Sequence, residues 1–286
     1  MSGAPETADP GYSHCDAELR AGDRDRWLAC LFAPVALRPH LDALYAFNLE
    51  IARVREIVSD PRLGEMRFQW WRDAIEGVAM GDAQAHPVAA ALGDTIRRFQ
   101  LPTKALIDLI DARTFDLYDD PMPTLLDLEG YCGETSSALM RLASLVLGQG
   151  GDPGGADAVG HAGVAYALMG LLRALPWHAA RGQVYVPADL LAKHGAESAD
   201  LLAGRLTPQI AAALAELRGV AHSHVEAAWA AAPQMQPAAR AALLPLALVA
   251  PYLAQMERRR FDPFGRLVDL PQWRRQWSLW RAARRL

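Results

Sequence analysis

Two carboxylates four residues apart, Glu56 and Asp60, are the first candidates for metal chemistry in this chain. Residues at i and i+4 share one face of a helix, so such a pair can hold Mg²⁺, a hard cation that prefers oxygen ligands. Asp60 precedes Pro61, and a residue before proline is pushed out of the helical region. We therefore expect the pair at a fraying helix end, with Glu56 as a solvated charge. A metal site shifted to this pair stays as an alternative.

No other kind of catalysis has a motif in the sequence. Cys132 has no histidine nearby in sequence, and no G-x-S-x-G is present. Residues 151–155 lack the G-x-x-x-x-G-K-[ST] pattern of a phosphate loop.

The three cysteines follow no disulfide or zinc spacing, which favours a reducing compartment. Nucleic-acid motifs are absent, and a net charge of −4 gives no general attraction to nucleic acid.

Helices are the elements that must position these residues. Of the 286 residues, 51% are hydrophobic and 22% are charged, which is typical of a globular protein with a sizeable core. Alanine and leucine dominate, and helical periodicity recurs along the chain. The predicted helices lie near residues 24–32, 38–59, 62–79, 86–99, 103–117, 124–147, 156–174, 207–231, 236–256 and 270–285. Residues 184–186 form the only strand-like run, so we predict an all-α domain.

No membrane-spanning helix and no secretory signal are expected. The longest uncharged stretches, 158–172 and 241–256, fall short of the roughly 18 to 20 apolar residues that a spanning helix needs. The first dozen residues are polar and contain glycine and proline, unlike a secretory signal.

Two segments resemble the metal-binding motifs of squalene/phytoene synthases. Residues 45–58, which begin Tyr-Ala-Phe, resemble the first aspartate-rich helix of that family, and residues 172–187 resemble the second. In the family, aspartates on these helices hold Mg²⁺ against the substrate diphosphate. The matching positions of this chain are Ala52, Glu56, Ala174, Trp177 and His178. Only one of them is acidic, and one carboxylate cannot hold the metal cluster that the family chemistry uses.

The resemblance covers about residues 24 to 260 and includes two further segments. Residues 131–139 begin with Tyr-Cys and continue with small residues. They resemble the helix of the family on which small residues let the substrate tail lie against the backbone. Small residues serve helix packing equally well. Residues 64–73 are similar to the family's tryptophan helix. The resemblance implies a single isoprenoid-synthase-like helical bundle around a central cavity, which we place at residues 16–260. Residues 1–15 are expected to be a flexible N-terminus, and 261–286 a basic, tryptophan-rich C-terminal segment.

The details of residues 48–54, 134–137 and 172–178 are closest to a non-catalytic branch of the family, typified by a mitochondrial respiratory complex I assembly factor. This resemblance implies a degenerate enzyme without metal or cofactor that acts as an accessory or assembly factor for complex I. Its partner would be a respiratory-chain subunit or another assembly factor. It would be cytoplasmic and peripheral to the inner membrane of a bacterium, or on the matrix face of a mitochondrion. Two alternatives stay open: an active prenyltransferase that uses Mg²⁺ to condense two prenyl diphosphates head to head, and a non-catalytic lipid or isoprenoid binder.

A ligand cavity would be lined by residues of the matching segments. The candidates are Tyr45, Arg53, Tyr131, Ser136, Arg173 and Arg181. Arg173 and Arg181, with Arg53 facing them, could hold a phosphate or a lipid head group without metal. The alternative, which we favour, is that Trp177 fills the space of the lost substrate, because filling a cavity is stabilising.

The C-terminal segment combines positive charge with aromatic residues. From residue 258 to 286 there are nine arginines and only two acidic residues. Trp273, Trp277 and Trp280 follow helical spacing and form one stripe, with Arg274 and Arg281 on a neighbouring face. Such a helix suits an anionic membrane surface or an acidic partner. Alternatively, the stripe packs on the domain itself and the arginines are solvated.

Overall fold

The computed structural model describes residues 10–77, 80–259, 261–265 and 267–286 of the chain. None of the described residues forms a β-strand, so the all-α prediction is confirmed. The α-helices are α1 (Pro10–Gly22), α2 (Arg24–Cys30), α3 (Arg38–Ile57), α4 (Pro61–Glu76), α5 (Met80–Ala85), α6 (Pro87–Phe99), α7 (Thr103–Arg113), α8 (Leu125–Cys132), α9 (Ala138–Leu147), α10 (Ala156–Arg173), α11 (Leu175–Ala180), α12 (Ala188–Lys193), α13 (Ser198–Leu202), α14 (Pro208–Ala231), α15 (Val249–Met256) and α16 (Gln272–Ala283).

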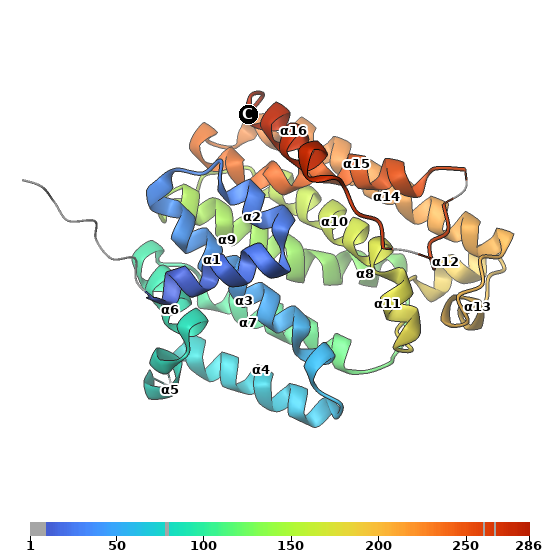
Figure 1. Ribbon diagram of the computed structural model, residues 1–286, viewed down its shortest axis with the longest axis horizontal. Helices are drawn as coiled ribbons and strands as arrows, with labels where there is room; N and C mark the ends of the chain where they lie inside the picture. Colours follow the sequence, from blue (N-terminus) through green and yellow to red (C-terminus); the bar gives the residue numbers. More distant parts are fainter. Residues whose placement is uncertain (1–9, 78–79, 260, 266) are drawn as a thin grey trace, which may run out of the picture.

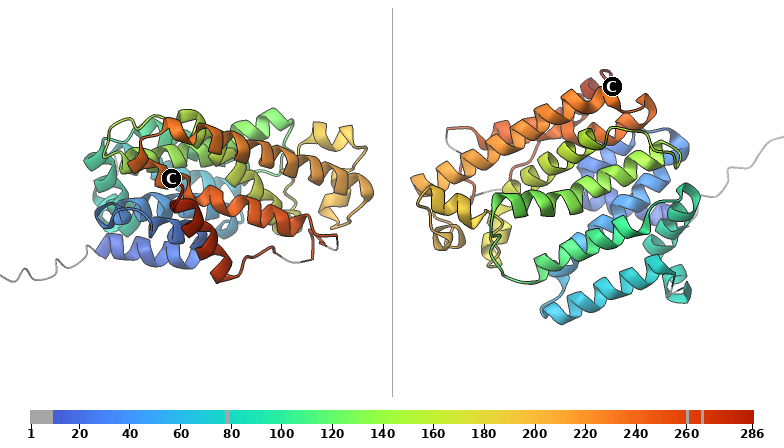
Figure 2. Two further views of the ribbon diagram at one scale, coloured as in Figure 1. Left: turned by 90° about the horizontal axis from the view of Figure 1, so that it is seen from above. Right: turned by 180° about the vertical axis from the view of Figure 1, so that it is seen from behind.

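The helices stack in layers (Figure 1). α14, α15 and α16 lie along one side of the bundle and α4 along the other, with α3, α9 and α10 between them. The central α10 packs along α14 and against α9. It also approaches the π-helical turn Gly133–Ser137 so closely that a Cβ atom at Gly163 would overlap the backbone of Ser137. Seen from behind, α14 runs the length of the bundle edge (Figure 2, right).

Two expectations about chain ends and helix ends were wrong. Residues 10–15, placed in a flexible N-terminus, belong to α1, because Cys15 and Leu19 are fully buried and hold that helix on the bundle. Residues 1–9 lie outside the described residues. Asp60 does not sit at a fraying end: its carboxylate caps α4 by accepting a hydrogen bond of 2.9 Å from the Arg62 backbone N–H.

One helical stretch of the described chain, Pro237–Met256, is long and apolar enough to cross a membrane, although none was expected. It runs from a 3₁₀ segment, Pro237–Leu248, into α15. Of its most apolar window, 56% is buried inside the fold, where it packs against α9, α10 and α16. Core packing therefore explains its composition.

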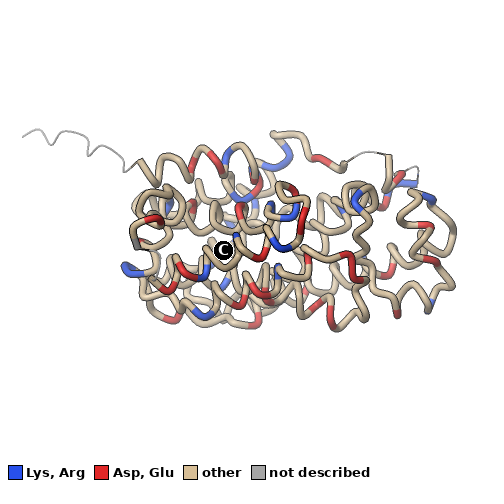
Figure 3. Tube along the Cα trace, turned by 90° about the horizontal axis from the view of Figure 1, so that it is seen from below, with Lys and Arg blue, Asp and Glu red and all other residues tan. Residues whose placement is uncertain are grey.

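Basic and acidic residues are interspersed along the chain over most of the bundle (Figure 3). The formal net charge is −4, with 29 lysines and arginines and 33 aspartates and glutamates. Any locally cationic region therefore comes from the placement of particular arginines rather than from the overall charge.

Candidate functional site

A cavity of about 490 Å³ lies where the C-terminal ends of α3 and α10 meet α11. It brings together all five positions that were expected to match metal-binding residues. The lining residues predicted from the sequence are Ala52, Arg53, Glu56, Arg173, Ala174, Trp177, His178 and Arg181. The structure thus gathers two segments more than 110 positions apart into one site, as their resemblance to facing motifs predicts.

Local sequence features set the shape of this site. α10 ends at Arg173, and α11 begins at once with Pro176 in its first turn, where the missing N–H of proline costs no hydrogen bond. Gly182 then adopts a positive φ of 78°, a conformation that favours glycine. This turn folds the chain back, so that Gln183 and Tyr185 line the cavity wall behind α11.

The floor of the cavity is a hydrogen-bonded cluster around Asp116, which is 6% exposed. The hydroxyls of Tyr131 and Tyr185 donate to its carboxylate at 2.8 and 2.7 Å, and Arg113 pairs with it at 3.0 Å. Gln183 donates to the backbone carbonyl of Asp116 at 2.8 Å. Burial raises the pKa of both tyrosine hydroxyls, so they remain donors at neutral pH.

Sequence reasoning missed this floor. Arg113 and Asp116 fall in the predicted helix 103–117, and an Arg and an Asp three apart are common surface neighbours. Tyr185 lies in the matching segment 172–187, but nothing local shows that its hydroxyl meets an aspartate 69 positions away. Tyr131 was expected to line a ligand cavity but does not line this one; it supports the floor from behind through its hydrogen bond to Asp116.

Arginines outnumber carboxylates around the cavity. The lining contains five arginines and two acidic residues: Arg53, Arg55, Arg113, Arg173 and Arg181 against Glu56 and Asp116. Arg181 lies over the Trp177 ring at 4.5 Å and has no ion pair with any described residue. The Nε atoms of Arg55 and Arg113 are buried without a hydrogen-bond partner. The site therefore suits an anion better than a cation.

The residues present do not fit a magnesium cluster. Glu56 is exposed at the cavity rim, and Asp116 is already bonded to two tyrosines and an arginine. Asp60, the partner in the alternative metal site, is engaged as the cap of α4. No three His, Cys, Asp or Glu side chains come together as a metal site anywhere in the described chain.

Trp177 does not plug the cavity, contrary to the interpretation that we favoured. Its side chain is 49% exposed, and the cavity beside it remains open. The reason is that the ring stays at the edge of the cavity, half exposed, with the guanidinium of Arg181 over it. His178 turns inward instead, with its ring 4.6 Å from that of Tyr185. Burial lowers the pKa of His178 to about 4, so it is neutral at neutral pH.

Besides Tyr131, two further predicted lining residues lie elsewhere. Tyr45 is buried, with its ring 5.4 Å from the guanidinium of Arg26. Ser136 sits in the π-helical turn, and its hydroxyl is buried without a hydrogen-bond partner. Neither lines the 490 Å³ cavity.

Comparisons with known proteins agree with this architecture. Residues 19–281 match the family model described as squalene/phytoene synthase. The chain is 32% identical over 253 residues to a Rattus norvegicus protein named NADH dehydrogenase (ubiquinone) complex I, assembly factor 6, covering 88% of this chain and 76% of that one. It is 28% identical over 276 residues to a phytoene synthase of Thermus thermophilus, covering 95% and 92%. The squalene synthase HpnC of Alicyclobacillus acidocaldarius has the same fold, with a TM-score of 0.75 at 24% identity, covering 89% of this chain and 95% of that structure.

Proposed function

This chain belongs to the squalene/phytoene synthase family, and we propose that it is a member without prenyltransferase activity that assists the assembly of respiratory complex I. It uses no metal and no cofactor. Its partner is a complex I subunit or another assembly factor, and it works at the membrane where that complex is built. This is the cytoplasmic face of the inner membrane in a bacterium, or the matrix face in a mitochondrion.

The observation that carries this proposal is the composition of the cavity. Diphosphate departure in a metal-dependent prenyltransferase needs carboxylates that gather Mg²⁺. Here the cavity offers Glu56 at its rim and an Asp116 whose oxygens are already bonded. The named assembly factor aligned at 32% identity supports the particular role, since it spans 88% of this chain.

The lack of prenyl transfer is tested by incubating the purified protein with farnesyl or geranylgeranyl diphosphate and Mg²⁺. We expect no diphosphate release above a no-protein control. Release well above that control, abolished by Glu56→Gln, would show that a metal site survives and would refute this part of the proposal.

The assembly role is tested by deleting the gene in its host. We expect less assembled complex I on native gels and a lower NADH:quinone reductase activity in membranes, with succinate dehydrogenase unchanged as the control. Both the original gene and a Glu56→Gln variant should restore complex I, because no metal chemistry is involved. Normal complex I in the deletion strain would exclude the role.

The open, arginine-lined cavity favours a second candidate function, binding of an isoprenoid or lipid phosphate without catalysis. Arg181 and the unpartnered Nε atoms of Arg55 and Arg113 supply free donors. A ligand at about 100 times its Kd should stabilise the fold by about 2.7 kcal/mol. We expect such a thermal shift with farnesyl diphosphate in EDTA, reduced by Arg181→Ala but not by Arg97→Ala on the exposed side of α6. No shift in EDTA would exclude this function.

A further inference from the structure

α16 is held on the outside of the bundle by one narrow face (Figure 1; Figure 2, left). Leu279 is fully buried and Arg275 is 5% exposed, and the helix packs on the 3₁₀ segment Pro237–Leu248 and on α2. Arg275 pairs with Asp25 at 2.6 Å and donates to the Tyr252 hydroxyl at 2.9 Å. These contacts attach α16 without using its tryptophans.

The tryptophan stripe points away from the protein. Trp273, Trp277 and Trp280 are 68%, 56% and 42% exposed, so the alternative that the stripe packs on the domain is wrong. The rings of Trp277 and Trp280 stack on each other at 5.0 Å. Large aromatic surfaces of this kind are normally buried, and a contiguous exposed group marks an interaction site.

The arginines beside the stripe have no counter-charge of their own. Four outer arginines lie here: Arg274 and Arg281 in α16, and Arg284 and Arg285 in the turn that follows it. In the part of the chain that the structure describes, none of them forms an ion pair. Arg284 lies over the Trp280 ring at 4.8 Å, which joins the cations to the aromatic stripe. The inward Arg275, by contrast, has two aspartate partners. The outer arginines are therefore available to an external anion.

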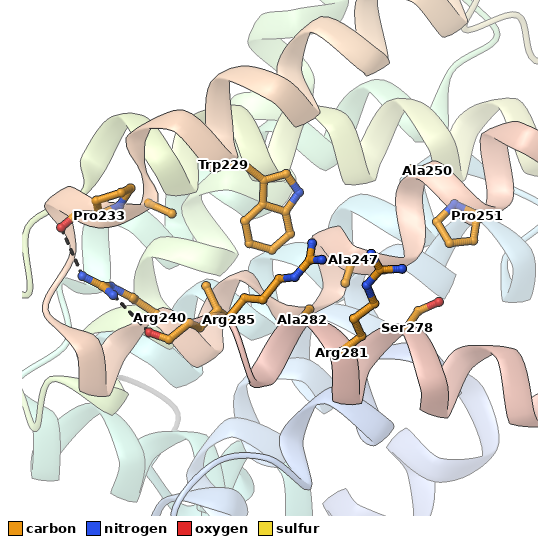
Figure 4. Close-up of a pocket in the computed structure, with 12 residues that line it drawn as sticks. Trp229, Pro233, Arg240, Ala247, Ala250, Pro251, Ser278, Arg281, Ala282 and Arg285 are labelled. Carbon is orange, nitrogen blue, oxygen red and sulfur yellow. Dashed lines mark hydrogen bonds between the residues drawn. The ribbon is translucent and has the colours of Figure 1, made fainter.

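A groove of about 660 Å³ borders this face, between α16 on one side and α14 and α15 on the other. Its walls are mainly apolar, with Trp229, Ala247 and Pro251 opposite α16. Figure 4 shows Arg281 of α16, and Arg285 from the turn after it, reaching into this groove. The mouth of an apolar groove thus carries two guanidinium groups, the arrangement that an anionic amphiphile fits.

We propose that the outward face of α16 docks on an anionic phospholipid bilayer, with the helix in the plane of the interface. The three tryptophans then lie at the headgroup level, where their rings are most stable, and the four outer arginines pair with lipid phosphates. This proposal goes beyond complex I assembly, since a bilayer surface can be used by a protein with or without that role.

Charge complementarity favours a bilayer as the partner of the outward face of α16. Residues 258–286 carry nine arginines and two aspartates, and one of these, Asp269, pairs with the buried Arg275 rather than with an outer arginine. The four outer arginines accompany an aromatic stripe along one helix rather than surrounding a defined pocket. A row of this kind matches a continuous anionic surface into which aromatic rings can insert.

The test is cosedimentation of the full chain with phosphatidylcholine vesicles, with and without phosphatidylglycerol. We expect binding about tenfold stronger or more on the anionic vesicles, because several arginines act together. It should be lost at about 1 M salt, where the Debye length is about 3 Å. Equal retention by both vesicle types, or retention by neither as expected of a surface for an acidic protein, overturns the proposal.

Matched variants locate the surface. Arg281→Glu should weaken binding to anionic vesicles several-fold, while Arg97→Glu, an equal charge change on the exposed face of α6, should have little effect. Trp277→Ala with Trp280→Ala should weaken binding more than Trp177→Ala, which removes a similarly exposed ring from α11. Equal losses within either pair would refute the assignment to α16. Because Arg281 has no described ion-pair partner, its variant remains informative even if the tryptophan variants fold poorly.

Discussion

The candidate site and the outward face of α16 both carry several arginines beside exposed tryptophan, but they differ in how the charges are balanced. Four of the five cavity arginines, Arg53, Arg55, Arg113 and Arg173, pair with carboxylates at 3.8, 3.2, 3.0 and 3.4 Å. The four outer arginines of the C-terminal segment have no such partner among the described residues. Most of the positive charge around the cavity is therefore neutralised by ion pairs within the protein, whereas the outer arginines remain available to an anion outside it.

α16 contains both an ion-paired arginine and arginines without an ion pair. Arg274 and Arg275 are adjacent, yet only Arg275 is buried in a network with Asp25 and Tyr252. Paired and unpaired arginines can therefore be compared at neighbouring positions with almost the same backbone.

The largest expected effect separates these two neighbours. Arg275→Ala leaves Asp25 buried without its main partner, so the free energy of unfolding should fall by about 3 to 5 kcal/mol. Arg274→Ala should change it by less than about 0.5 kcal/mol, as for most surface substitutions. Urea unfolding measures both. Similar costs for the two variants would mean that the two faces of α16 do not differ as described.

The next effect concerns His178 in the cavity. The folded protein protonates this ring near pH 4, while the unfolded chain protonates it near its ordinary pKa of 6.5. Protons are thus taken up by the unfolded state first, and the free energy of unfolding should fall as the pH drops from 6.5 to 4. The loss is up to about 3 kcal/mol, from 1.36 kcal/mol per pKa unit.

A His178→Phe variant isolates this contribution, because phenylalanine can keep the ring contact with Tyr185. Unfolding curves of both proteins at pH 7 and pH 4.5 give the comparison. We expect the variant to lose less stability on acidification than the parent. If both lose the same amount, His178 does not titrate on unfolding and lies in a wetter site than the structure indicates.

A smaller effect tests the floor of the cavity. Tyr185→Phe removes one hydrogen bond to the buried Asp116, which keeps its bonds to Tyr131 and Arg113, so we expect a loss of about 1 kcal/mol. The control is Tyr118→Phe, which removes an exposed hydroxyl bonded to Glu65 and should cost almost nothing. A floor variant as stable as the control would show that the Asp116 cluster does not contribute to folding.

The smallest expected effect is that of Trp277→Ala on the exposed face of α16, which is compared with a substitution on the buried face of the same helix. Trp277→Ala should lower the free energy of unfolding by less than about 1 kcal/mol, since the ring is mostly exposed. Leu279→Ala on the buried face should cost about 2 to 5 kcal/mol. Thermal melts of the two variants provide the measurement. A large cost at Trp277 would indicate that the stripe is part of the core.

Helix length decided how much of the fold was predictable. Every predicted range contains helix, and all but one of those ranges are long enough, at more than ten residues, to show their apolar periodicity plainly. The exception, 24–32, corresponds to the seven-residue α2, which Asp23 caps. The helices that were missed include α5, α11, α12 and α13, each of five or six residues and too short to display a period. α1 was missed because it is largely polar and buries only Gly11, Cys15 and Leu19.

The sequence by itself determined the helical elements, the absence of acidic side chains at Ala52 and Ala174, and the aromatic and basic spacing of α16. These properties depend on residue identity and on hydrogen bonds between positions four apart, so they can be read locally. Only the tertiary structure decided which arginines are paired, which way Trp177 points and what closes the cavity floor. Asp25 and Arg275 are 250 positions apart, and Asp116 and Tyr185 are 69 apart. Contacts between residues so far apart depend on how whole helices pack together, so local sequence patterns do not predict them.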